Sequence, residues 1–130
     1  EGMAYGVDFS PDGEKVISCG NHRHVRISKA DDGKLVREIG GFDASVMRVR
    51  VSKSGAVYSS AANHHVRVHN LEDGKLIRSF EGHRDWVYGL DVHEATGLLA
   101  TGSHDGEVRI WNVKTGDVMV SFVASPGFGD

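Results

Sequence analysis

Short runs of alternating apolar and polar residues follow one another along the chain, separated by turns that are rich in Gly and Asp. Residues 4–9, 46–51 and 87–92 are typical of these runs, which are five to seven residues long. Alternation with a period of two is the pattern of a β-strand that buries one face. No stretch has the period of an amphipathic helix. The pattern therefore predicts an all-β protein built from short strands.

The turns divide these runs into three groups of four strands. Ser10-Pro11-Asp12-Gly13 is a typical separator, because Pro presets φ and Gly accepts a positive φ. The predicted strands are residues 4–9, 15–20, 24–28 and 35–39 in the first group, 46–51, 56–61, 65–69 and 76–80 in the second, and 87–92, 98–102, 108–112 and 118–122 in the third.

A repeat with a period near forty residues underlies this grouping. Val25-Arg26-Ile27 recurs as Val66-Arg67-Val68 and as Val108-Arg109-Ile110, 41 and then 42 residues further on. The third repeat also opens with Gly82-His83 and closes with Trp111-Asn112. A period of this length with these dipeptides is typical of WD40 propeller blades. Over residues 4–123, and most closely in the third repeat, the chain resembles the WD40 family.

The resemblance implies a β-propeller fold with one four-stranded blade in each repeat. The blades are expected at about residues 4–41, 46–82 and 87–123, in a single propeller segment over residues 1–130. Closed propellers usually contain four to eight blades, so three blades form an open arc whose two end blades expose apolar faces. We therefore expect either a homodimer that closes a six-bladed ring through its terminal blades, or a part of a larger propeller.

Composition and charge exclude several classes of partner. Hydrophobic residues make up 39% and charged residues 25% of the 130 residues, as in ordinary soluble domains. The net charge of -3 does not predict binding to nucleic acid or to an anionic membrane. No apolar run approaches the length of a membrane span. The single cysteine excludes an internal disulfide, which favours a cytoplasmic protein.

By the resemblance, the third repeat carries the hydrogen-bonded tetrad of WD40 blades. His83 is expected to bond Asp105 and a strand hydroxyl, either Thr101 or Ser103, and the hydroxyl to accept from the indole of Trp111. A buried Trp needs an acceptor for its single N–H, and a chain of polar groups supplies one. The same residue types also occur in hydrolase triads, but the sequence has neither a nucleophile elbow nor an oxyanion loop. We therefore predict a structural role and no catalytic residue.

The first two repeats depart from this tetrad and are expected to be less rigid than the third. Their strands must be held together by apolar packing and by backbone hydrogen bonds. Position 105 of the third repeat corresponds to Asn63 and His22, position 111 to His69 and Ser28, position 83 to Phe42, and position 101 to Ser59 and Ser18.

Histidines gather at the turns between the second and third strands of the repeats. His22, His24 and His64 could coordinate a divalent ion there, since residues two apart on a strand share a side. No carboxylate or cysteine completes a known ligand spacing, and turn histidines are usually solvated. No metal site is therefore predicted, and a pH-sensitive rim is an equal alternative.

Arg26, Arg67 and Arg109 occupy one position of the third strand in all three repeats. They could bind phosphate or an acidic peptide. In an acidic chain we favour the alternative, in which their stems pack between blades and their guanidinium groups meet nearby acids such as Asp8, Asp91 or Glu107.

A candidate surface for binding a protein or peptide partner lies where the chain enters the innermost strands. In WD40 proteins such positions face the ligand rim, and exposed Trp, Tyr and Arg often anchor interfaces. The alternative is that Trp86 simply closes the edge of its blade. The residues of this candidate rim are Tyr5, Arg48, Arg84, Asp85, Trp86 and Tyr88.

The sequence therefore predicts a non-catalytic scaffold for protein interactions, with no cofactor, that associates with itself to close a propeller. This inference from fold to function rests on analogy. The alternative is the propeller portion of a larger protein that also contains an enzyme.

Overall fold

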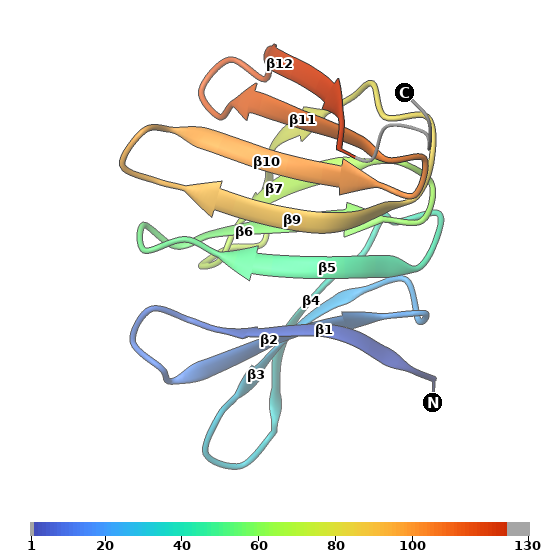
Figure 1. Cartoon of the computed structure of the whole chain (residues 1–130). Helices are drawn as coiled ribbons and strands as arrows, with labels where there is room; N and C mark the ends of the chain where they lie inside the picture. Colours follow the sequence, from blue (N-terminus) through green and yellow to red (C-terminus); the bar gives the residue numbers. More distant parts are fainter. Residues whose placement is uncertain (1, 125–130) are drawn as a thin grey trace.

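Three antiparallel sheets of four strands form the part of the chain that the structure, a computed structural model, describes, residues 2–124 (Figure 1). In each sheet the strands lie in sequence order. This arrangement confirms the predicted all-β fold of three four-stranded blades. Blade 1 contains β1 (Ala4–Phe9), β2 (Lys15–Gly20), β3 (Val25–Lys29) and β4 (Leu35–Ile39); blade 2 contains β5 (Val46–Val51), β6 (Ala56–Ala61), β7 (Val66–Asn70) and β8 (Leu76–Phe80); blade 3 contains β9 (Val87–His93), β10 (Leu98–Ser103), β11 (Glu107–Asn112) and β12 (Val118–Val123).

Two of the third strands begin one residue later than predicted. His24 and His65 precede β3 and β7 instead of opening them. The residue before each of them, Arg23 or His64, has a left-handed backbone with φ of 65°. This conformation closes the turn between the second and third strands.

The first strands of the blades lie side by side through the middle of the molecule (Figure 1). β5 packs against β1 and β2 of blade 1, and β9 packs against β5 and β6 of blade 2. Each blade therefore has a forward face toward the next blade in the chain and a rear face toward the preceding one. Within residues 2–124, only blade 2 has another blade on both faces.

Two apolar cores fill the junctions between neighbouring blades. Burying one large aliphatic or aromatic side chain stabilises a fold by about 1.5–3 kcal/mol, so the junctions hold the blades together. The core between blades 1 and 2 contains Ile17, Cys19, Val25, Ile27, Ile39, Phe42, Val46, Val49, Val57, Ala61 and Leu71. The core between blades 2 and 3 contains Tyr58, Val66, Val68, Phe80, Val87, Leu90, Leu99 and Trp111.

The lone thiol belongs to the first of these cores. Cys19 is fully buried, and burial raises the pKa of its thiol to about 12. The thiol therefore stays protonated at neutral pH and acts as a small apolar side chain. Within residues 2–124 no helix is long and apolar enough to cross a membrane.

Close packing of the innermost strands depends on Gly6 in β1. A Cβ at this position would lie 2.9 Å from the sulfur of Cys19 and 3.3 Å from the Cα of Arg48 in β5. Since backbone atoms of the next blade cannot move aside cheaply, a side chain at Gly6 would push blades 1 and 2 apart.

Gly6→Ala is therefore expected to lower the free energy of unfolding by about 1–3 kcal/mol in urea titrations of the dilute chain. Gly89→Ala is the matched control, because Gly89 has the same repeat position on the forward face of blade 3. There a Cβ would meet its nearest atom, the backbone nitrogen of Gly102, only at 3.5 Å. Equal effects of the two substitutions would contradict this account of the junction.

Candidate functional site

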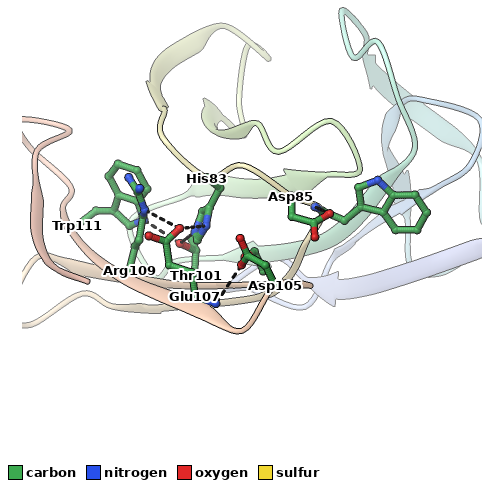
Figure 2. A network of polar contacts seen from close by, with 9 residues as sticks. His83, Asp85, Thr101, Asp105, Glu107, Arg109 and Trp111 are labelled. Carbon is green, nitrogen blue, oxygen red and sulfur yellow. Dashed lines mark hydrogen bonds and ion pairs between the residues drawn. The ribbon is translucent and has the colours of Figure 1, made fainter. Parts of the chain in front are cut away.

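A buried network of polar side chains joins the second and third strands of blade 3 to the loop before β9 (Figure 2). The indole Nε1 of Trp111 in β11 donates to the Oγ1 of Thr101 in β10 over 2.8 Å. The Nε2 of His83 lies 2.5 Å from the same hydroxyl oxygen. The structure thus places Thr101, rather than Ser103, between the histidine and the indole.

The carboxylate nearest to the histidine differs from the one expected. Glu107 Oε1 lies 3.3 Å from His83 Nδ1, close but not aligned as a hydrogen bond. Asp105 instead accepts from the hydroxyl of Ser103 and from the backbone N–H of Glu107, the latter over 3.0 Å. Asp105 is exposed and closes its own turn, whereas Glu107 is the first residue of β11 and is half-buried beside the imidazole.

Arg109 completes the network above the indole. Its guanidinium carbon lies 5.5 Å from the centre of the Trp111 ring, a cation–π contact. Its Nε lies 3.1 Å from Glu107 Oε1. The positive charge of Arg109 offsets the charge of Glu107, so a partly buried carboxylate is tolerated beside a neutral histidine.

Burial lowers the pKa of His83 below its ordinary value of 6.5, and the nearby carboxylate of Glu107 only partly offsets this effect. The imidazole is therefore neutral at pH 7. With its proton on Nδ1, toward Glu107, its Nε2 accepts from the hydroxyl of Thr101, which itself accepts from Trp111. The hydroxyl of Thr101 is buried and bonded to both His83 and Trp111, so it is not presented to a substrate.

Acidification is expected to destabilise the fold through these buried histidines. Burial also lowers the pKa of His69. A lowered folded-state pKa means that the unfolded chain binds more protons below about pH 6.5, so stability is complete above that pH and is lost as the pH falls. The free energy of unfolding, measured by urea titration between about pH 7 and pH 5, should therefore decrease.

His69→Phe should make this decrease shallower, since a phenyl ring keeps the aromatic contact and does not titrate. His93→Gln, in exposed surroundings, serves as the control substitution. Equal pH profiles of native chain and His69→Phe would show that the buried imidazole is not linked to stability.

Aromatic stacking replaces the network in blade 2. The rings of Phe42 and His69, which correspond to His83 and Trp111, lie 5.8 Å apart. The guanidinium of Arg67 lies 5.2 Å from the centre of the Phe42 ring and donates to the carbonyl of Gly41 over 3.0 Å. The expectation that blades 1 and 2 are less rigid stays a prediction.

The arginines of the third strands meet the expectation in part: two of the three guanidinium groups contact acids, but Arg26 is exposed on the uncovered rear face of blade 1. Arg109 contacts Glu107, Arg26 donates to Glu38 over 2.8 Å, and Arg67 bonds a backbone carbonyl instead. Of the acids named as examples, Glu107 is contacted by Arg109, whereas Arg26 contacts Glu38, which lies directly opposite on β4.

Aromatic rings cluster at the predicted partner rim. The rings of Trp86 and Tyr88 lie 6.0 Å apart, and that of His104 lies 6.3 Å and 5.9 Å from them. Asp85 Oδ2 lies 3.3 Å from His104 Nδ1. The indole of Trp86 is 50% exposed, so it remains open to a partner. Sequence reasoning did not include His104 here, although its turn position beside β9 was visible.

Tyr88 connects this cluster with two of the remaining predicted rim residues. Tyr5, Arg48 and Tyr88 line a shallow hollow of about 370 Å³ over the innermost strands. Arg48 donates to the carbonyls of Met47 over 2.8 Å and of Tyr5 over 3.4 Å, so it also ties β5 to β1. Arg84 is exposed.

The histidines considered as metal ligands do not converge. The rings of His22 and His24 stack 6.0 Å apart, and His24 lies 3.7 Å from Glu38. His64 instead packs edge-on against His65, at 5.1 Å. Among residues 2–124 no group of three or more metal-binding side chains comes together.

Comparison with protein families supports the repeat assignment. The family model described as WD domain, G-beta repeat matches residues 2–27 and 74–112, half of the chain. Similar proteins include Eukaryotic translation initiation factor 3 subunit I of Aspergillus niger, 32% identical over 80 residues, and of Aspergillus oryzae, 34% identical over 80 residues. Each match covers 61% of this chain and 24% of the relative, so the aligned part spans about a quarter of these proteins.

A solved structure with the same fold is that of the computationally designed Ika8 protein. It superposes with a TM-score of 0.84 and 21% identity, over 95% of this chain and 37% of the designed one. At this identity the likeness concerns the fold alone. It shows that blades packed as here occur within a longer chain.

Proposed function

This chain belongs to the WD40 repeat family, and from that premise we propose that it is a protein-interaction scaffold that closes its propeller by binding a second copy of itself. The observation that carries the proposal is the exposure of apolar side chains at the two ends of the arc. At each end, the same repeat positions are buried wherever a neighbouring blade is present.

The rear face of blade 1 is one of these ends. Val7, Val49 and Leu90 have the same position, each paired across the sheet with the hydroxyl residue of the second strand. Val49 and Leu90 are 4% and 8% exposed because the preceding blade covers them, whereas Val7 is 66% exposed. Phe9, two residues further along β1, is also exposed.

The forward face of blade 3 is the other end. Ile39, Phe80 and Phe122 share one position, opposite the first valine of their third-strand neighbours. Ile39 and Phe80 are 5% and 0% exposed, and Phe122 is 49% exposed. Ala100, Ile110 and Val120 form a second cross-strand row beside it.

A second copy can cover both ends at once. Its blade 1 would pack against blade 3 of the first copy, and its blade 3 against blade 1, which gives two identical junctions and a closed ring of six blades. Three copies would give nine blades, beyond the usual range of four to eight. Burial of rows such as Val7 and Phe122 supplies the driving force.

The rim around Trp86 is the second proposed interaction surface. The relatives are, by name, subunits of a translation initiation factor, so we infer that this chain also serves within a multi-protein assembly, in the cytoplasm. The exposed indole, the ring of Tyr88 and the carboxylate of Asp85 suit an interface that a protein or peptide partner completes.

Co-purification of two differently tagged copies of the chain tests the self-association. Recovery of one tagged copy with the other is expected for the native chain and for Trp86→Ala, since the rim lies outside the junction. Proteins that co-purify with the native chain should no longer co-purify with Trp86→Ala, and this comparison tests the rim. Failure of the two copies to co-purify would overturn ring closure without affecting the rim.

A further inference from the structure

One position of the innermost strands carries a charge in every blade. Asp8, Arg50 and Asp91 are each paired with the residue at the centre of the second strand, opposite Ile17, Tyr58 and Ala100. All three charged residues line one open hollow at the centre of the arc. From blade 1 to blade 3, the charges of this row are therefore negative, positive and negative.

The charges of this row act across the junctions between blades. Asp8 Oδ2 of blade 1 accepts from the backbone N–H of Val51 in blade 2, over 2.9 Å. The residue before Val51 is Arg50, whose side chain has no acceptor atom for this N–H. Arg50 Nε in turn donates to the carbonyl of Leu90 in blade 3, over 3.4 Å. At each existing junction a charged side chain thus bonds the backbone of the next blade, and the row positions on the two sides carry opposite charges.

Ring closure would break this alternation. Asp91, in the position of Asp8, would approach the backbone N–H of Phe9 in the second copy. That N–H already donates to its own carboxylate, Asp8 Oδ1, over 2.9 Å, just as the N–H of Val92 donates to Asp91 Oδ1 over 3.0 Å. The incoming carboxylate therefore finds this donor already in use and lies next to a second carboxylate.

We propose that the contact between Asp91 and Asp8 of the partner subunit limits self-association, so that closing the ring is weak until one of the two carboxylates is neutralised. The inference rests on the proposed ring closure and describes its control. Other charged groups around the hollow are Arg50 and Lys53 from blade 2 and His93 and Glu94 from blade 3. Among the described residues that line the hollow, the charges of Lys53 and Glu94 cancel, which leaves Arg50 to offset two aspartates.

The test compares the dimer dissociation constants of full-length variants by sedimentation equilibrium at neutral pH. Like charges about 4 Å apart repel by on the order of a tenfold factor in an equilibrium constant, and the ring contains two such contacts. Asp91→Asn is expected to tighten the dimer at least tenfold. Asp91→Arg, which sets a positive charge against Asp8 of the partner subunit, should tighten it further.

Asp73→Asn is the matched control, because it removes the same charge from the β7–β8 turn of the covered blade. An asparagine there can still accept the bond from the backbone of Lys75. Circular dichroism of the dilute variants checks that each one is folded.

The outcomes separate the two proposals. A native dimer that Asp91→Asn leaves unchanged, or weakens, relative to Asp73→Asn would overturn this inference and leave ring closure intact. If the native chain remains monomeric at the highest concentration reached, ring closure is wrong and this inference falls with it.

Discussion

Trp111→Ala is expected to lower the free energy of unfolding by about 3–5 kcal/mol, among the largest effects of any single substitution in this chain. Trp111 is 1% exposed and packs edge-on against Phe80 of blade 2, with ring centres 5.6 Å apart. Its removal leaves a cavity in the junction between blades 2 and 3. It also removes the N–H that Thr101 accepts, and the ring beneath Arg109.

Trp111→Phe separates the packing of this side chain from its hydrogen bond. A phenyl ring keeps much of the contact with Phe80 but has no N–H for Thr101, so we expect a loss of less than half that of the alanine variant. Both are measured by urea titration of the dilute chain. A loss below about 1 kcal/mol for Trp111→Ala would mean that the junction does not depend on the indole.

Phe122→Asp is expected to abolish self-association, with a dissociation constant at least a hundredfold higher than that of the native chain. The substitution places a charge in the centre of a closing junction, where it would be buried without a partner. Val7→Asp should have the same effect from the opposite half of the junction. Because the ring contains two identical junctions, one substitution disrupts both.

Leu76→Asp is the matched control for these two variants. Leu76 is similarly exposed but lies on β8, the outermost strand of the blade whose two faces are covered. It should leave the dissociation constant measured by sedimentation equilibrium nearly unchanged. If all three substitutions weaken the dimer equally, the effect comes from added charge and not from the uncovered faces.

The strand arrangement could be predicted from sequence because it depends on local features. Alternating residues and Gly-containing turns place each strand, and the repeat aligns the blades. The sequence did not predict the left-handed conformation of Arg23 and His64, at the position where the third repeat has Gly106. Nothing in the residue types of Arg and His indicates that conformation, which L side chains adopt only at a cost.

The buried network could be predicted in part. Repeat position identified Trp111 and His83, but Asp105 and Glu107 are two residues apart and carry the same functional group. Which carboxylate approaches His83 depends on how the β10–β11 turn closes, because Asp105 is used by that turn. Spacing alone does not contain this information.

The contacts to backbone carbonyls also could not be predicted from the sequence. Arg48 was expected at a partner rim, yet it reaches the carbonyl of Tyr5 in blade 1, and Arg50 reaches that of Leu90 in blade 3. Every residue carries a carbonyl, so such acceptors leave no signal in a residue pattern. The distance between the innermost strands decides which of them are within reach.

The central claim is that the uncovered faces of blades 1 and 3 cover each other in a second copy. Light scattering coupled to size exclusion, on a dilution series of the 130-residue chain, tests it most directly. The account predicts a mass that rises with concentration from that of one chain to that of two, and no further. A mass of one chain at every concentration, or growth past two chains, would contradict it.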